Sequence, residues 1–153
     1  MPIIFTRVDN RLIHGQVVEG WLPFVKPQEI VVISKEAAAS ALAKKMLRMS
    51  LPKNYALEVF APEEGAQYLA NNSAARQMLL LESIADLKEL LEAGVTLKNV
   101  NIGNTNYARD KTPHNDSVFL TRQERALLQT LKETGAVVEF CALPSSISSR
   151  FYK

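Results

Sequence analysis

A histidine lies among charged residues in the segment TRVDNRLIHGQVVEGW. Arg7, Asp9 and Arg11 precede His14, and Gly15 follows it. An imidazole in this setting can act as a general base, a metal ligand or a phosphoryl acceptor. The arginines disfavour the imidazolium form and repel a metal dication, but they attract a phosphoryl group of about −1.5 to −2 charge. Phosphoryl chemistry therefore fits best; the plain alternative is a structural turn in which the carboxylate pairs with an arginine.

The flanking pattern predicts where His14 lies. The run IIFTRV, residues 3–8, predicts a strand, and residues 15–22 predict a helix that Pro23 should end or kink. His14 thus lies at a strand-to-helix junction. Ligands of parallel sheets bind beyond the carboxyl ends of the strands, and the free N–H groups at a helix N-terminus favour an anion.

Strand-like and helix-like segments alternate through the rest of the chain. Further strands are expected at residues 29–34, 56–61, 77–82, 97–103, 117–120 and 136–143. Helices are expected after caps at Ser34, Ser83 and Thr121 and from Pro62, with stops at Gly94 and Gly135. In the helix after Ser34, Ala38, Leu42, Met46 and Met49 fall at helical spacing. This order predicts an α/β fold, an open, mostly parallel twisted sheet with helices on both faces.

Composition narrows the class of protein. A chain of 153 residues suggests one domain, and a net charge of +2 is too small to argue for nucleic acid or a membrane surface. No apolar run is long enough for a bilayer, and the N-terminus lacks the pattern of a secretory signal. Cys141 has no second cysteine and lies in an apolar run, so we expect a buried reduced thiol. These features indicate a cytoplasmic protein.

Two segments resemble a known family. RVDNRLIHGQV resembles the active-site segment of the enzyme IIB component of the bacterial phosphoenolpyruvate-dependent sugar phosphotransferase system (PTS). In its mannose/fructose/sorbose/N-acetylgalactosamine family the pattern reads R-[IV]-D-[DE]-R-L-I-H-G-Q-V, from which only Asn10 departs. VNIGNTNYARDKT is similar to the family's V-N-[VI]-G-[GN] segment, and its Asn104 and Tyr107 resemble the N-acetylgalactosamine branch more than the mannose branch. The resemblance covers most of the chain and implies a single IIB phosphocarrier domain over residues 1–153.

The resemblance implies a protein-histidine–sugar phosphotransferase. A IIB component accepts a phosphoryl group from a phosphohistidine on the IIA component, here onto Nδ1 of His14. It then transfers the group to sugar entering through the membrane components IIC and IID. No cofactor, metal or nucleic acid is required, and the protein would be cytoplasmic and peripherally associated with the transporter. The family contains isolated domains and fusions, and a homo-oligomer is compatible with it.

These considerations assign roles to residues. We predict that His14 carries the phosphoryl group. The residues predicted to bind the phosphate are Arg7, Arg11, Gly15 and Gln16. The supporting residues are Asp9, which would orient an arginine, and Asn104, at the same edge in the irregular stretch 104–116. We expect Trp21 to pack in the core and His114 to be exposed.

Other classes stay open at this point. One is a module that binds a phosphorylated metabolite reversibly with the same arginines and helix N-terminus. Another is a regulatory protein whose histidine senses phosphorylation without onward transfer, which the departure at Asn10 allows. A hydrolase or a nucleotide-binding enzyme is weakly supported, because G-x-S-x-G, the P-loop and G-x-G-x-x-G do not occur.

Overall fold

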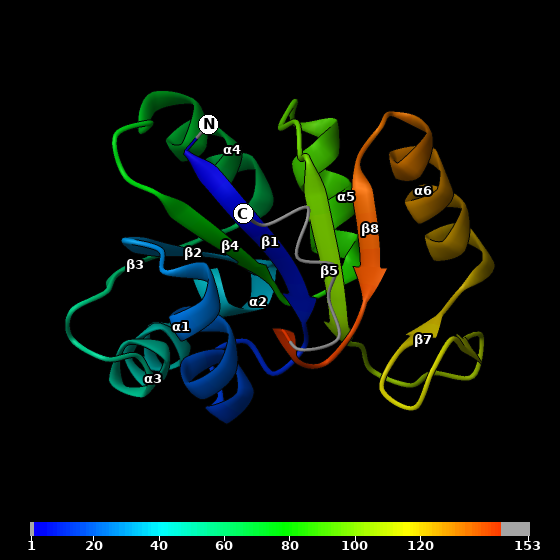
Figure 1. Cartoon of the computed structure of the whole chain (residues 1–153), viewed down its shortest axis with the longest axis horizontal. Helices are drawn as coiled ribbons and strands as arrows, with labels where there is room; N and C mark the ends of the chain where they lie inside the picture. The colour runs from blue at the N-terminus through cyan, green and yellow to red at the C-terminus, as the bar shows by residue number, and fades with distance from the viewer. Residues whose placement is uncertain (1, 145–153) are drawn as a thin grey trace.

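The computed structural model describes residues 2–144 and contains a six-stranded sheet in which all neighbouring strands are parallel (Figure 1). The strand order is β3-β2-β4-β1-β5-β8. The strands are β1 Ile3–Asp9, β2 Glu29–Ile33, β3 Ala56–Phe60, β4 Gln77–Leu81, β5 Asn99–Asn104 and β8 Val137–Phe140. The predicted open parallel α/β sheet is confirmed.

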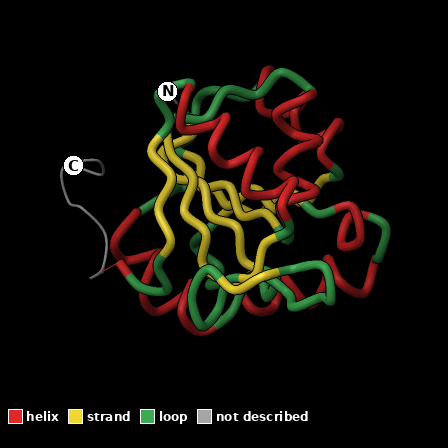
Figure 2. Tube along the Cα trace, turned by 90° about the vertical axis from the view of Figure 1, so that its right-hand side faces the viewer, coloured by secondary structure: helices red, strands yellow, loops and turns green. Residues whose placement is uncertain are grey.

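Helices cover both faces of this sheet (Figure 2). On one face lie the π-helix η1 Val17–Trp21, α1 Leu22–Val25, α2 Lys35–Ala38 and α3 Ala41–Ser50. On the other lie α4 Pro62–Asn71, α5 Ile84–Glu92 and α6 Arg122–Glu133. Each face therefore has its own apolar core.

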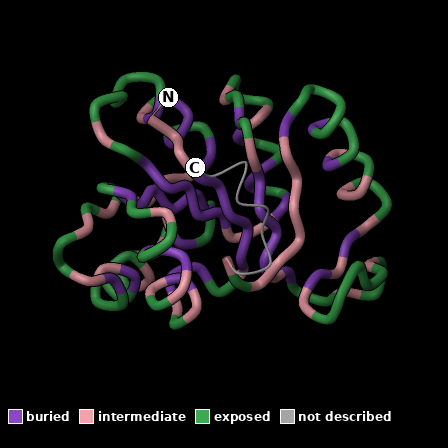
Figure 3. Tube along the Cα trace, viewed as in Figure 1, coloured by how far each residue is buried: buried purple, intermediate pink, exposed green. Residues whose placement is uncertain are grey.

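The central strands read as continuous apolar runs because both of their faces are covered. All five residues of β2 and of β4 are buried, as the centre of Figure 3 shows. Along β2, Ile30 and Val32 enter the core beneath α1 and α3, whereas Val31 and Ile33 enter the core beneath α4 and α5. The alternation of a strand thus joins the two cores through one sheet.

Several predicted helix boundaries are confirmed. Ser83 caps α5, and Thr121 and Glu124 form a complete capping box at the start of α6. Gly94 and Gly135 follow the ends of α5 and α6 with φ of 98° and 96°, in the left-handed region that favours glycine.

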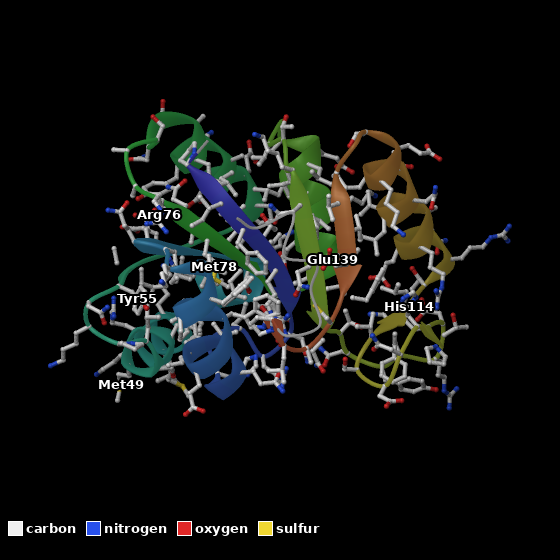
Figure 4. The ribbon with its side chains drawn as sticks, viewed as in Figure 1. Met49, Tyr55, Arg76, Met78, His114 and Glu139 are labelled. Carbon is white, nitrogen blue, oxygen red and sulfur yellow. The ribbon has the colours of Figure 1, made fainter. Side chains whose placement is uncertain are left out.

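The helix expected after Ser34 is two helices. Ser34 caps α2, and Ser40 caps a new helix, α3, so the phase of the apolar pattern is broken between them. As a result Leu42, Met46 and Met49 do not enter the core and are 68%, 59% and 77% exposed. Figure 4 shows Met49 on the outer side of α3.

The first helix does not end at Pro23. The N–H of Leu22 donates to the carbonyl of Val17, five residues back, which widens the helix into η1. Pro23 is the second residue of α1, which continues from η1 without a break. The helix continues to Val25 and stops at Lys26, whose φ is 54°.

The predicted strand at residues 117–120 is not part of the main sheet. β7, Phe119–Leu120, pairs antiparallel with β6, Thr112–Pro113, in a separate two-stranded ribbon. This ribbon closes the long loop that follows β5. Within residues 2–144, no helix combines the length and the apolar character needed to cross a membrane.

Candidate functional site

A tight turn after β1 presents His14 at the carboxyl edge of the sheet, the lower edge in Figure 1. Leu12 has a φ of 56°, and its N–H donates to the carbonyl of Asp9 at 3.0 Å. Leu12 and Ile13 are buried and anchor the turn, whereas the His14 side chain is 17% exposed. The carbonyl of His14 accepts from the N–H of Val18 at 3.0 Å, so a helix begins directly after it.

The topology opens a crevice at this edge. The chain leaves β1 for η1 and α1 on one face of the sheet, but it leaves the neighbouring β4 for α5 on the other face. Ligands of open parallel sheets bind where neighbouring connections diverge in this way. The structure therefore places His14 at the edge that the sequence predicts.

Asp9 connects the charged groups of the site. Its Oδ1 accepts from the backbone N and Nε of Arg11, at 3.0 and 3.1 Å. Its Oδ2 accepts from Arg7 Nη2 and Arg11 Nη2, both at 3.1 Å, and lies 2.9 Å from His14 Nε2. Burial alone would raise the pKa of Asp9, but the hydrogen bonds from Arg11 and His14 and the charge of Arg7 hold that pKa below its usual range. Asp9 is thus an anion that orients both arginines and the imidazole. The sequence predicted this role toward an arginine.

The contacts of the His14 ring define its tautomer. An ionised carboxylate only accepts, so the Nε2 that faces Asp9 carries the hydrogen. Nδ1 is then unprotonated, and it accepts from the backbone N–H of Gln16 at 3.3 Å. Nδ1, which keeps its lone pair, is therefore the nucleophilic atom of this ring.

The two arginines occupy different environments. Arg7 is fully enclosed, whereas the Arg11 side chain is 40% exposed and its Nη2 also donates to Oε1 of Gln16 at 3.0 Å. Burial lowers the pKa of Arg7, and Asp9 opposes that shift. Arg11 can therefore meet an anion at the surface. The Arg7 side chain is buried, and its Nη2 donates to Asp9, so its charge reaches the site through that carboxylate. Its predicted role in binding phosphate stays a prediction.

The other predicted phosphate-binding residues lie beside His14. Gly15 is exposed, and a Cβ added to it would meet nothing within 4 Å. No neighbouring atom therefore requires a glycine at position 15. The absence of a side chain there leaves the start of the helix accessible from solvent. Gln16 contributes a backbone N–H toward the ring and a side chain to Arg11.

Asn104 braces the turn rather than the ring. Its Nδ2 donates to Oδ1 of Asn10, and its carbonyl accepts from the backbone N of Asn10 at 3.1 Å. Asn10 in turn donates to Oδ1 of Asn106. An amide at position 10 both donates and accepts, which a carboxylate cannot do. The departure at Asn10 therefore ties the loop after β5 to the turn that holds His14.

The remaining predictions concern residues away from the ring. Trp21 is buried and stacks on Phe5 with ring centroids 4.9 Å apart, which confirms its core position. Cys141 follows the end of β8 and is half-buried rather than buried, contrary to expectation; burial still raises the pKa of its thiol, in agreement with an unreactive cysteine. His114 is exposed, as expected, yet its ring also stacks on Phe140. Within residues 2–144, no group of three or more His, Cys, Asp or Glu side chains could hold a metal ion.

Asn101 and Gly103 belong to the segment VNIGNTNYARDKT and Leu12 belongs to RVDNRLIHGQV, but no role was predicted for these three residues. Asn101 and Gly103 lie in β5 and contact or face the Arg7 guanidinium. The signal that could have assigned them a role is their spacing, since Asn101 and Gly103 are two residues apart in one strand and therefore lie on the same face. Nothing in the sequence marks Leu12 for a positive φ, since leucine rarely adopts one.

Together these features describe an α/β protein that presents a carboxylate-oriented histidine at the carboxyl edge of a parallel sheet. The family described as "PTS system sorbose subfamily IIB component" matches residues 3–153. The chain belongs to this family of IIB components of the sugar phosphotransferase system.

Its relatives include IIB components named for different sugars. The fructose-specific EIIB component of Bacillus subtilis (strain 168) is 29% identical over 153 residues, which cover 99% of this chain and 94% of that protein. The mannose-specific EIIAB component of Escherichia coli (strain K12) is 30% identical over 141 residues, which cover 91% of this chain but 44% of that longer protein. The solved N-acetylgalactosamine-specific IIB component 1 of Escherichia coli superposes with a TM-score of 0.86 at 25% identity, covering 93% and 94% of the two chains.

Proposed function

We propose that this chain carries a phosphoryl group on Nδ1 of His14, between the phosphohistidine of a IIA component and an imported sugar. Membership of the IIB family already implies a phosphoryl carrier in sugar transport. The observation that supports His14 most directly is its tautomer. Asp9 accepts the hydrogen bond from Nε2, so Nδ1 carries no hydrogen and keeps its lone pair at an exposed helix start.

Two transfers make up the proposed reaction. In the first, Nδ1 of His14 attacks phosphorus, the new N–P bond forms, and the N–P bond to the donor imidazole breaks with its electron pair returning to the donor ring. In the second, a sugar hydroxyl oxygen forms the new O–P bond while the bond to Nδ1 breaks. The electron pair returns to Nδ1, and the hydroxyl proton passes to a base at the sugar site.

The site supports these steps by position and charge. Arg7 and Arg11 bear two positive charges against the single negative charge of Asp9, which leaves one positive charge for an incoming phosphoryl group. Arg11 meets that group directly, and the backbone N–H of Gln16 is directed at the atom where the bond forms. Such transfer needs alignment and charge balance more than covalent help from the protein.

The partners follow from the same proposal. The donor would be a IIA component. One relative is named a mannose-specific EIIAB component, a name that joins the IIA and IIB components. The acceptor would be sugar bound by the membrane components IIC and IID. The chain would then work in the cytoplasm, peripherally at the membrane.

Intact mass after phosphorylation tests the proposal. The purified chain is incubated with phosphoenolpyruvate, enzyme I, HPr and IIA proteins from the fructose, mannose and N-acetylgalactosamine branches. We expect one acid-labile phosphoryl group on the wild-type chain and none on His14→Ala. His114→Ala is the matched control, since it removes the other histidine, and it should be phosphorylated like wild type.

Two results would contradict the proposal. Phosphorylation of His14→Ala would place the acceptor elsewhere. Absence of any adduct on the wild-type chain, when each IIA protein is itself shown to be phosphorylated, would favour a module that binds phosphate without forming a bond.

A further inference from the structure

Gly103 lies against the guanidinium of Arg7. A Cβ built on Gly103 would lie 2.5 Å from Nη1 of Arg7 and closer still to Nη2 and Cζ, whereas real Cβ atoms keep at least 3.0 Å. Gly103 is not among the glycines with positive φ, so its backbone could accommodate any residue. What excludes a side chain at position 103 is therefore the space that Arg7 fills.

Other groups complete the enclosure, which we call the Arg7 seat: Asn101, Gly103, Trp21 and the carbonyls of Cys141 and Ala142. Nη1 donates to Oδ1 of Asn101 and, at 3.0 Å, to the carbonyl of Cys141. Nη2 donates to the carbonyl of Ala142 at 3.3 Å. The guanidinium carbon lies 4.8 Å from the Trp21 ring centroid, within the range of a cation–π contact.

The seat is itself held from several directions. Nδ2 of Asn101 donates to Sγ of Cys141 at 3.0 Å, which directs its Oδ1 toward Arg7. Nε1 of Trp21 donates to the carbonyl of Ala142 at 2.9 Å. Residues from η1, β5 and the segment after β8 thus fix one guanidinium, which supplies many donors in a rigid planar fork.

One oxygen connects the Arg7 seat to the reactive ring. Oδ2 of Asp9 accepts from Nη2 of Arg7 and also faces Nε2 of His14. If the guanidinium moves, this oxygen loses its donor on the Arg7 side, and the carboxylate shifts toward Arg11, which still donates to both of its oxygens. The shift takes Oδ2 away from Nε2 of His14 and weakens the contact that keeps hydrogen on Nε2.

We propose that Gly103 and Asn101 are positioning residues, which seat Arg7 so that Asp9 holds His14 with Nδ1 unprotonated. The consequence for phosphoryl transfer rests on the proposed function, but the effect on the tautomer does not. Because the clashing atoms are the far end of a side chain, Gly103→Ala displaces Arg7 rather than the backbone of β5. We therefore expect the variant to fold and to lose the alignment of the ring.

Nitrogen-15 NMR of the imidazole groups tests this arrangement, since the chain has two histidines and His114→Ala assigns them. In the wild type we expect one His14 tautomer with hydrogen on Nε2. In Gly103→Ala we expect mixed tautomers and, with a cognate phosphorylated IIA protein, acceptance slower by about 10²-fold. Gly20→Ala is the matched control: its added Cβ meets Leu143 and Pro144 at an ordinary 3.7 Å, so tautomer and rate should stay as in wild type.

A double-mutant cycle separates seating from a general loss of structure. In an Arg7→Lys background the planar group that Gly103 accommodates is gone, so Gly103→Ala should have little further effect on tautomer or rate. Asn101→Ala, which leaves more space rather than less, should shift the tautomer in the same direction even if Gly103→Ala does not fold.

Clear outcomes would overturn the inference. A folded Gly103→Ala with a wild-type tautomer would show that the Arg7 seat does not control His14. Fully additive effects of Gly103→Ala and Arg7→Lys would show that Gly103 acts independently of Arg7. If the wild-type chain accepts no phosphoryl group, the proposed function fails, and the tautomer measurements still decide whether the seat positions the ring.

Discussion

Buried carboxylates lie at both edges of the sheet, Asp9 at the carboxyl edge and Glu29 at the amino edge. Glu29 begins β2 opposite Gln77, the first residue of β4. Its carboxylate accepts from the hydroxyl of Tyr68 at 2.7 Å and from Nε2 of Gln77 at 2.9 Å. These donors are neutral, whereas the donors around Asp9 include two guanidinium groups.

The Asp9 and Glu29 clusters differ in whether positive charge remains after the carboxylate is paired. Around Glu29 the contacts join α4 to two strands, and the groups that donate to the carboxylate add no positive charge. Around Asp9 two cations exceed one anion, and Arg11 and His14 reach the surface. Both clusters satisfy a buried carboxylate, but of these two clusters the one at the carboxyl edge has positive charge left over at the surface.

Replacing Asp9 should have the largest effect. Asp9→Asn removes the negative charge and replaces one acceptor oxygen with an NH2 donor, which allows the other tautomer of His14, so acceptance of phosphoryl should fall by roughly 10²–10⁴-fold. It also leaves Arg7 buried without a carboxylate, which should cost about 3–5 kcal/mol in the free energy of unfolding. Phosphorylation kinetics and urea unfolding measure the two effects. Glu29→Gln is the control, and it should change acceptance little.

The pH dependence of unfolding gives an independent check on Asp9. Its folded pKa lies below the usual value, so the folded state binds fewer protons than the unfolded state in that interval. The stability that Asp9 contributes is therefore complete above about pH 5 and is lost as pH falls through about 3.9 and below. Asp9→Asn should flatten this acid limb, and an unchanged limb would contradict the assignment.

A smaller effect is expected for the exposed arginine. Arg11→Lys keeps the charge but loses the planar fork that donates to Asp9 and Gln16 and that, in the proposed function, also meets the phosphoryl group. Acceptance should slow by about tenfold, because a charge-assisted hydrogen bond is worth about 1.5–3 kcal/mol. Stopped-flow or rapid-quench transfer from a phosphorylated IIA protein measures it. Wild-type rates in this variant would assign Arg11 a structural role.

The smallest effect is expected at the amino edge. Burial and the neighbouring carboxylate of Glu29 raise the pKa of Tyr68 to about 12. The pKa of Tyr68 is higher in the folded than in the unfolded state, so folding favours the protonated hydroxyl. The stability that this hydroxyl contributes is therefore complete below about pH 10 and is lost as pH rises through 12. Tyr68→Phe should cost about 1 kcal/mol at neutral pH without changing acceptance. Ultraviolet titration of tyrosinate should lose its component near pH 12 in this variant.

The sequence predicted the elements whose pattern is local. Continuous apolar runs located β2 and β4, and Ser83, Thr121, Gly94 and Gly135 set helix ends by short-range chemistry. His14 was found because a strand-to-helix turn and its charges lie in one short segment. Position at the sheet edge followed from the alternation of strands and helices.

The sequence could not predict features that depend on distant contacts. The burial of Arg7 depends on Asn101 and Ala142, which are far along the chain, so its charge in the sequence did not show how deeply it lies. The exposed face of α3 follows from the new cap at Ser40, which the apolar spacing across both helices concealed.

The wide turn in η1 holds one residue more than an ordinary α turn. Deleting the exposed Glu19 would therefore return the turn to α geometry and leave Trp21 directed at Phe5 and the Ala142 carbonyl. The same deletion in an ordinary α turn would rotate all that follows by about 100°. This helix can thus lose one residue at η1 without moving the aromatic ring against which Arg7 packs.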